Sequence, residues 1–223
     1  MKAPRVTDLA WQAWRIISTR FPAVDLFESL APPEDWEALA ALEALTNPRV
    51  LAAVGDLTRV PPSERVGGPG ASYLMAPFVH PRPGRFSDAD HGALYAADRL
   101  ETAIAETRHH QEAFCRDGGL GPLDLDLRVL GLRVRGAFRD LRGLRRPELY
   151  HPTDYTASQA LAADLRREGA AGVIYDSVRL PGGQCVAAFT PRGLSHARHL
   201  RFLCYRWDGH RIAEVFEKRP LQL

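Results

Sequence analysis

The stretch at 84–107 constrains the fold more than any other, because it predicts a loop, a short strand and a helix in immediate succession. A glycine and Arg85 open a turn-rich loop, and the apolar run 93–97 (ALYAA) then predicts a strand that contains Tyr95. The residues that follow predict a helix that carries Glu106. This order places a cation, an aromatic ring and a carboxylate at one end of a strand–helix unit.

The predicted helix has a candidate N-cap and an apolar face. Asp98 precedes the helix, where an aspartate can accept hydrogen bonds from the free N–H groups of the first turn. The apolar face consists of residues at helical spacing: Leu100, Ala103, Ile104, Thr107 and Phe114. Glu106 lies about 100° from the centre of that face. A glutamate at this border is either solvated or a partly desolvated carboxylate that reaches a cleft, and periodicity does not decide between the two.

Strands predominate in the second half of the chain. Apolar and charged residues alternate from Leu123 to Val129, and the alternation then changes phase, which predicts a β-bulge near Val129 and Leu130. The other elements expected here are a strand at 172–175 that leads into Ser177, a strand at 184–189, a hairpin within 200–216 with a type I′ turn at Asp208-Gly209, and a helix at 156–167 capped by Asp154 or Thr156.

The first half of the chain combines a strand with several helices. Residues 11–18 (WQAWRIIS) form an apolar run that predicts a buried strand containing Arg15. The other expected elements are a helix at 36–45, a second helix that begins at Asn47-Pro48, a loop at 55–72 and a strand at 73–78. The GGPG run inside that loop lacks the GxxxxGK[ST] pattern of a phosphate-binding loop and is not expected to open a helix.

Because helices gather in the first half and strands in the second, we expect a single α+β domain with mixed and antiparallel sheets and flanking helices. It is expected to span 1–223, with a strand and a helical layer in 1–80 and a core in 81–223. A chain of 223 residues buries well over half of its unfolded surface, so this domain needs neither a disulfide nor a metal to fold.

Composition argues against several classes of function. The formal net charge is +2, from 29 basic and 27 acidic residues, which gives no reason to expect direct nucleic-acid binding. The three cysteines are widely spaced and form no metal motif, so thiols in a reducing compartment are expected. No run approaches the ~18 apolar residues of a membrane span, and the N-terminus lacks the apolar segment of a signal peptide. We therefore expect a soluble, cytoplasmic protein.

Three groups of polar residues each allow two interpretations. His109-His110 and the acidic and histidine residues of 88–91 lack tetrahedral or HExxH spacing, so solvated faces are expected rather than a metal site. An arginine in a buried strand needs a partner, so Arg15 either forms a salt bridge or is directed at a phosphate. The six arginines within 133–146 form either a solvated face or a docking surface for an acidic partner or substrate.

Several motifs resemble the RES domain, a family named for an arginine, a glutamate and a serine. Three runs are similar to the core of that domain: Gly84-Arg85-Phe86, Leu94-Tyr95-Ala96-Ala97 and Ala103-Ile104-Ala105-Glu106. Three later runs are similar to the second half of that domain. They are Asp154-Tyr155, the helix–strand unit SQALAADLRREGAAGVIYDS that ends in Ser177, and 180–183 (LPGG) followed by 185–189 (CVAAF). Trp14-Arg15-Ile16 resembles its opening strand. These elements cover nearly the whole chain and come in the family's order.

The resemblance implies an NAD-consuming toxin of a bacterial toxin–antitoxin pair, with a fold similar to ADP-ribosyltransferases of the diphtheria-toxin type. Such an enzyme cleaves the nicotinamide–ribose bond of NAD and passes ADP-ribose to a protein, or to water or phosphate. Residues 22–28 (PAVDLFE) and 71–80 (ASYLMAPFVH) are most similar to the ParT-like branch, which implies ribose-phosphate pyrophosphokinase as the acceptor. The family also implies an Xre-like antitoxin that covers the active site. NAD is then a substrate, and no metal is expected.

The resemblance implies roles for five residues. Glu106 would stabilise the oxocarbenium-like ribose left when the cationic nicotinamide departs. Arg15 and Arg85 would hold the diphosphate, since the forked donors of arginine match it. The ring of Tyr95 either stacks on nicotinamide or is an ordinary core aromatic. Ser177 either hydrogen-bonds the nicotinamide amide, a ribose hydroxyl or a phosphate, or caps the end of its strand; no GxSxG pattern supports a nucleophile.

The sequence departs from the family pattern at two places. Phe86 and Ser87 stand where shorter members have tryptophan and asparagine, so contacts made by that asparagine are in doubt here. Ile104 stands two residues before Glu106, where toxins that modify arginine usually have a glutamine or glutamate, which argues against arginine as acceptor. The rival hypothesis is a non-enzymatic module that only recognises a partner.

Overall fold

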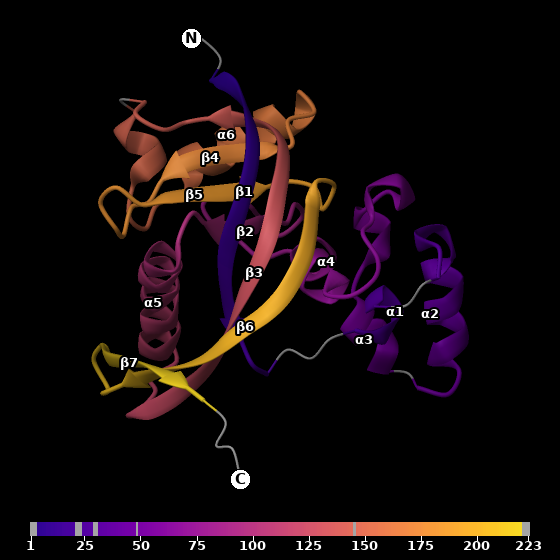
Figure 1. Ribbon diagram of the computed structural model, residues 1–223, viewed down its shortest axis with the longest axis horizontal. Helices are drawn as coiled ribbons and strands as arrows, with labels where there is room; N and C mark the ends of the chain where they lie inside the picture. The colour runs from indigo at the N-terminus through magenta and orange to yellow at the C-terminus, as the bar shows by residue number, and fades with distance from the viewer. Residues whose placement is uncertain (1–3, 21–23, 29–30, 48, 145, 220–223) are drawn as a thin grey trace.

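In the part of the chain that the structure describes, seven strands form one sheet and six α-helices flank it (Figure 1). The computed structural model describes residues 4–20, 24–28, 31–47, 49–144 and 146–219. The strands are β1 (Arg5–Ser18), β2 (Leu94–Ala97), β3 (Leu123–Asp140), β4 (Gly172–Asp176), β5 (Gln184–Ala188), β6 (Leu194–Trp207) and β7 (Ile212–Lys218). The helices are α1 (Asp25–Glu28), α2 (Trp36–Ala44), α3 (Arg49–Val54), α4 (Ala71–Val79), α5 (Leu100–Asp117) and α6 (Thr156–Arg167).

Strand β1 closes five of the strands into a ring. The sheet order is β1-β2-β5-β4-β3-β6-β7, and β1 also pairs with β3 from Arg5 opposite Asp140 to Ser18 opposite Leu127. Among the described pairs, β3 and β4 are parallel and the rest are antiparallel. Strands β6 and β7 extend the sheet beyond β3, and β1, β3 and β6 curve together across the molecule (Figure 1). This mixed sheet with flanking helices confirms the expected α+β class.

One apolar cluster fills the ring. It takes buried side chains from all five ring strands, among them Leu9, Leu94, Leu132, Ile174 and Val186. The same cluster continues into α4 and the helices before it, which lie to one side of the ring (Figure 1). Because adjacent strand residues point to opposite faces, the odd-numbered neighbours on β2, β4 and β5 point to the outer face of the ring.

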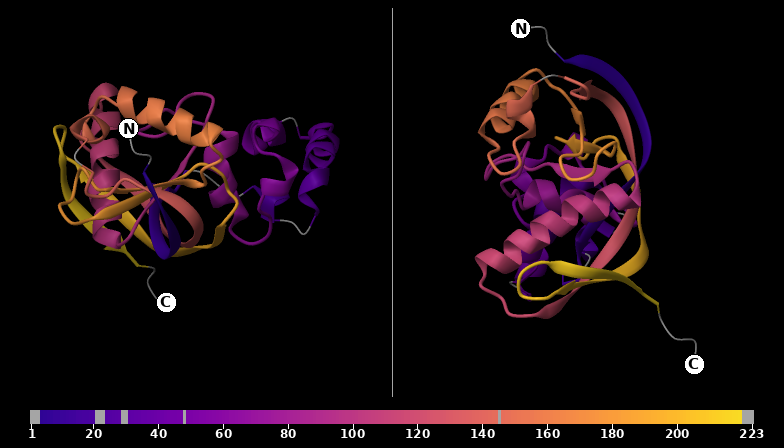
Figure 2. Two further views of the ribbon diagram at one scale, coloured as in Figure 1. Left: turned by 90° about the horizontal axis from the view of Figure 1, so that it is seen from above. Right: turned by 90° about the vertical axis from the view of Figure 1, so that its left-hand side faces the viewer.

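Helices α5 and α6 cover the outer face. Helix α6 buries Ala162 and Leu165 against Val173 of β4 and Ala187 of β5. Helix α5 shares a second cluster with the far parts of β3, β6 and β7, and contributes Cys115 to it. Both helices lie on the same side of the molecule, α6 nearer to the end of the ring where β1 begins (Figures 1 and 2). The outer surface of the paired strands β2 and β5 therefore lies between these two helices.

Several predicted elements are confirmed. Strand β1 contains the predicted run at 11–18 but begins six residues earlier, at Arg5. The register between β3 and β6 shifts between Val129 and Leu130, where the change of phase predicted a bulge. The helices expected after Pro32 and near Asn47 are present as α2 and α3, although Pro48 lies outside the described residues.

The strand predicted at 73–78 is wrong, because this segment is helix α4. Its buried residues Ala71, Leu74, Met75 and Phe78 are spaced three and four apart, which is helical periodicity. Gly70 is the N-cap, with a φ of 84°, so the GGPG run does open a helix. The two aromatic residues of this run, Tyr73 and Phe78, are of a type common in strands, but the spacing of its buried positions identifies the helix.

The predicted N-cap of α5 is also wrong. Arg99, not Asp98, precedes the first helical residue. The Asp98 carboxylate instead accepts hydrogen bonds from Thr102 Oγ1 (2.8 Å) and from the backbone N–H of Gln184 (3.1 Å). Asp98 therefore ties the first turn of α5 to β5.

Two aspartates stabilise turns in ways that the sequence patterns only partly predicted. Tyr155 is the N-cap of α6, while the Asp154 carboxylate accepts a hydrogen bond from the N–H of Thr156 at 2.9 Å. The β6–β7 hairpin turns at Asp208 and Gly209 as predicted, but a type I′ turn would need positive φ at both, and only Gly209 (φ 101°) has it. The Asp208 carboxylate instead accepts hydrogen bonds from the N–H groups of His210 (2.8 Å) and Arg211 (2.9 Å).

The three cysteines are buried and unpaired. Among the helices of the described segments, none combines the length and the apolar character that crossing a membrane requires.

Candidate functional site

Arg85 is a buried cation with no acidic partner in the described part of the chain. The residue is 8% exposed, and its Nη1 donates a hydrogen bond to the carbonyl of Leu149 at 2.8 Å. The guanidinium lies 4.8 Å from the centre of the Tyr155 ring. Burying a charge without a counter-charge is costly, so a site of this kind favours an anionic ligand.

Tyr95 anchors the loop that carries Arg85. Its hydroxyl accepts the backbone N–H of Phe86 at 2.8 Å and lies 3.0 Å from Ser87 Oγ. Since the Ser87 hydroxyl donates to the Arg82 carbonyl at 2.8 Å, the phenol donates its own hydrogen to Ser87. Burial raises the pKa of the Tyr95 phenol, so this hydrogen is retained at neutral pH. Tyr95 therefore holds the loop through its hydroxyl, while its ring is half-buried on the outer face of β2.

Glu106 and Ser177 are joined by a short hydrogen bond. Ser177 Oγ donates to Glu106 Oε1 at 2.6 Å. The same Oγ accepts backbone N–H groups from Arg179 (3.1 Å) and Leu180 (3.0 Å), so its lone pairs are occupied and its hydrogen is directed at the carboxylate. Glu106 is half-buried and projects from α5, and Ser177 follows β4 directly. This bond orients the carboxylate at the border position that helical periodicity predicted.

Tyr175 and Cys185 line the same region, and sequence reasoning missed both. They face each other across β4 and β5, and Cys185 Sγ lies 3.9 Å from Glu106 Oε1. Burial raises the pKa of both side chains; the negative charge of Glu106 raises it further, and the positive charge of Arg85 acts against it. The ring of Phe86, next to Arg85 in the loop, packs on the Tyr175 ring with centroids 4.9 Å apart, so the Arg85 loop and Glu106 both border this pair. The alternation of side chains along β4 and β5, which places Tyr175 and Cys185 on the outer face, could have identified both residues from the sequence.

Arg15 has no salt bridge within the described segments, so the first of its two alternatives is wrong there. Its Nη1 donates to the carbonyl of Tyr95 at 3.0 Å, and its Nε is buried without a partner. Burial lowers the pKa of Arg15 to about 10, so the side chain is still charged at neutral pH. The structure thus places the Arg85 loop, Tyr95, Glu106 and Ser177 on the outer face of the ring. Arg15 lies between Trp14 and Ile16 of that face, so its side chain starts on the opposite face and donates to the main-chain carbonyl of Tyr95.

Arg179 and His109 connect the segments that border this region. Arg179 Nη2 donates to His109 Nε2 at 2.7 Å and also to the carbonyl of Pro152. His109 therefore accepts through a nitrogen that carries no proton. Burial first, and the charge of Arg179 second, lower the pKa of His109. This pair links α5, the loop before α6 and the turn after Ser177.

The other polar clusters form local hydrogen bonds and ion pairs. Within the described residues, no three His, Cys, Asp or Glu side chains are grouped as a metal ion would require. Asp88 instead accepts hydrogen bonds from the N–H groups of Asp90 (2.8 Å) and His91 (2.6 Å). In the arginine-rich segment, ion pairs join Arg139 to Glu168 (2.8 Å), Arg142 to Asp140 (2.7 Å) and Arg146 to Glu148 (3.0 Å), while Arg133 and Arg135 are exposed. Arg145 lies outside the described residues.

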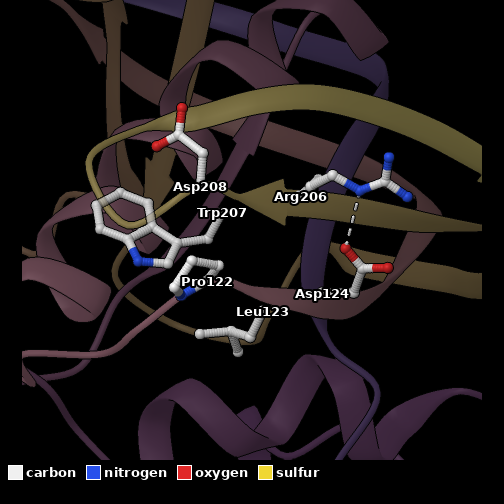
Figure 3. Close-up of a pocket in the computed structure, with 6 residues that line it drawn as sticks. All are labelled: Pro122, Leu123, Asp124, Arg206, Trp207 and Asp208. Atoms are coloured by element: carbon white, nitrogen blue, oxygen red, sulfur yellow. Dashed lines mark hydrogen bonds and ion pairs between the residues drawn. The ribbon is translucent and has the colours of Figure 1, made fainter.

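A separate surface hollow lies where β3 begins and β6 ends (Figure 3). Its lining consists of Pro122, Leu123, Asp124, Arg206, Trp207 and Asp208. Arg206 forms a 3.3 Å ion pair with Asp124 there. It contains none of the residues that the sequence singled out for chemistry, so the Glu106 region remains the candidate site.

Comparisons with known proteins identify the family. The RES domain matches residues 62–208. The uncharacterized protein y4oC of Sinorhizobium fredii is 32% identical over 212 residues, which cover 91% of this chain and 86% of that protein. A crystal structure of the M. tuberculosis MbcT–MbcA toxin–antitoxin complex aligns with a TM-score of 0.47 and 12% identity, over 87% of this chain and 86% of that chain. The family match covers more than half of the sequence and includes Arg85, Glu106 and Ser177, and the chain belongs to the RES domain family.

Proposed function

We propose that this chain is an NAD-consuming toxin of a toxin–antitoxin pair, which cleaves the nicotinamide–ribose bond. One observation carries the proposal: the Glu106 carboxylate is oriented by Ser177 in the same region as Arg85, a buried guanidinium without an acidic partner among the described residues. A carboxylate beside an anion-binding cation suits a substrate with a cationic leaving group and a diphosphate tail. Membership of the RES family supports this choice of substrate.

Glu106 is the proposed catalytic carboxylate. Nicotinamide leaves NAD as a neutral molecule and takes the bonding electron pair, so no general acid is needed. The ribose that remains carries oxocarbenium character, and a carboxylate stabilises that charge. At about 4 Å and an effective dielectric of ~20, one such contact contributes about 4 kcal/mol. This corresponds to a rate increase of roughly a thousandfold.

Arg85 and Arg15 are the proposed diphosphate ligands. Both lack a carboxylate partner among the described residues, and Arg15 Nε is buried with its hydrogen unused. Guanidinium groups bind phosphate oxygens through two parallel donors, which gives orientation as well as attraction. Tyr95 is proposed to position the Arg85 loop through its hydroxyl and to offer its ring to nicotinamide.

The acceptor proposed for ADP-ribose is a protein, and ribose-phosphate pyrophosphokinase is the proposed target. Water or phosphate as acceptor would make the chain an NAD glycohydrolase or phosphorylase. A partner that only binds the chain would make it a non-enzymatic module. An Xre-like antitoxin is proposed to cover the site, because a free NAD consumer would deplete its own cell.

Incubation with NAD tests the proposal. The expected result is release of nicotinamide, with the remaining product identified by mass spectrometry with and without phosphate, and with labelled NAD to reveal any modified protein. Glu106→Gln should lower nicotinamide release about a thousandfold. Glu101→Gln, an exposed glutamate on the same helix, is the matched control and should behave as the unmodified protein. Equal release by the Glu106→Gln protein would refute the proposal and favour the binding module.

A further inference from the structure

Helix α6 presents one row of polar side chains to the loop at 84–92. Gln159 and Arg166 are seven residues apart, which is two helical turns, so they lie on the same face of the helix. Tyr155, four residues before Gln159, stacks on the Arg85 guanidinium at the end of that row. The apolar face of α6, with Ala162 and Leu165, lies next to this row and packs into the core.

Gln159 binds both ends of the turn that carries Arg85. Its Nε2 donates to the carbonyls of Gly84 and Ser87, each at 3.0 Å. Carbonyl oxygens only accept hydrogen bonds, so both hydrogens of the amide nitrogen point to this turn. Gly84 and Ser87 also pair with each other through their backbones, at 3.0 Å and 3.4 Å. One side chain thus holds the two ends of the Arg85-Phe86 turn.

Arg166 binds the same loop further along. Its Nη2 donates to the carbonyls of Phe86 (2.8 Å) and Gly92 (3.0 Å). Its guanidinium lies 4.0 Å from the centre of the Phe189 ring. No carboxylate forms an ion pair with it among the described residues, so this cation is used for loop carbonyls rather than for an acid. Four carbonyls of the loop therefore point at two side chains of α6.

We propose that Gln159 and Arg166 are positioning residues that hold the loop at 84–92 so that Arg85 is presented to the diphosphate of NAD; this inference rests on the proposed function. A loop ordered before binding loses less conformational freedom when the ligand arrives. Their effect is on ligand binding, because neither side chain touches Glu106 or Ser177. Removing either one raises KM for NAD and leaves kcat nearly unchanged.

Neighbouring arginines on α6 supply a matched test. Arg166→Met removes the two loop bonds and keeps the apolar stem, whereas Arg167→Met changes an exposed arginine that pairs only with Asp164 among the described residues. Gln159→Leu removes the other pair of bonds at similar volume. The measurements are KM and kcat for nicotinamide release, affinity for ADP-ribose by calorimetry, and hydrogen exchange of amides 84–92.

Arg166→Met and Gln159→Leu are each expected to raise KM and to weaken ADP-ribose binding by about tenfold, with kcat within about twofold. Exchange at 84–92 should become faster in both. Arg166→Lys, which keeps one donor group, should recover part of the loss. Arg167→Met should change none of these quantities.

The outcomes separate the two proposals. If the unmodified protein neither releases nicotinamide nor binds ADP-ribose, the proposed function fails, and unchanged exchange at 84–92 in the variants would then overturn the positioning role as well. If the unmodified protein is active but the variants keep their KM, or lose kcat instead, the positioning role is overturned and the proposed function stands. Should Arg166→Met fail to fold, Arg166→Lys and Gln159→Leu decide by the same criteria.

Discussion

Ser177 donates its hydroxyl hydrogen to Glu106 Oε1 at 2.6 Å, although the two residues are 71 positions apart in the sequence. The serine follows a strand of the ring, and the glutamate projects from a helix packed on the outside of that ring. The bond fixes one oxygen of the carboxylate and leaves the other without a hydrogen bond from the described residues.

Ser177→Ala should lower kcat for nicotinamide release by about tenfold, because the carboxylate loses the donor that orients it. It should also lower the free energy of unfolding by ~1 kcal/mol, since the N–H groups of Arg179 and Leu180 lose their acceptor. Steady-state kinetics and urea denaturation measure the two effects. Ser63→Ala, at an exposed position, is the control. An unchanged kcat would show that Ser177 does not orient the carboxylate.

Tyr95→Phe should separate the hydroxyl of Tyr95 from its ring. The variant keeps the aromatic face but leaves the buried N–H of Phe86 without its acceptor, which costs ~1–3 kcal/mol of unfolding free energy. Because the loop of Arg85 loosens, KM for NAD should rise more than kcat falls. Calorimetric unfolding and steady-state kinetics measure this. If stability and KM both stay unchanged, the hydroxyl does not hold the loop.

The His109–Arg179 pair should make stability depend on pH. The pKa of His109 is lowered from its ordinary value of 6.5 by burial and by Arg179, with His110 acting in the same direction and Glu106 and Glu112 against it. A base whose folded pKa is depressed favours folding while it is neutral. The contribution is therefore complete above pH 6.5 and is lost as the pH falls through the folded pKa.

His109→Gln provides the measurement for that prediction. A glutamine carbonyl oxygen accepts a hydrogen bond at any pH, so this variant should lose less stability than the unmodified protein between about pH 6.5 and 5. Urea denaturation across this range gives the comparison. His210→Gln, in the exposed β6–β7 turn, should keep the original slope. Identical slopes for the His109 variant and the unmodified protein would contradict the role of the pair.

Gly84→Ala should destabilise the loop that carries Arg85. A Cβ at this position would lie 2.9 Å from Ser87 Oγ and 3.0 Å from the Tyr95 hydroxyl, so the hydrogen bonds between those groups must shift. The expected loss is ~1–3 kcal/mol of unfolding free energy. Gly121→Ala is the control, because a Cβ there meets no atom within 4 Å. Equal denaturation midpoints for the two variants would exclude a tight fit at Gly84.

Local patterns in the sequence predicted those features that depend on neighbours along the chain. The alternation from Leu123 and its change of phase at Val129-Leu130 predicted β3 and its bulge, because side chains on a strand point alternately to two faces. Helical spacing placed Glu106 at the border of the apolar face of α5. The resemblance to the RES domain supplied Arg85 and Ser177, which periodicity could not single out.

The tertiary structure alone decided which of these groups meet. Closure of β1 onto β3 and the order of β2, β5 and β4 bring Tyr175 and Cys185 beside Glu106, and no local pattern encodes such long-range pairing. The same holds for Gln159, whose amide binds carbonyls more than 70 positions earlier. Segment 73–78 was predicted as a strand, yet burial of its residues at helical spacing against the ring stabilises a helix. Propensity is a weak local preference, and the area buried on packing outweighs it.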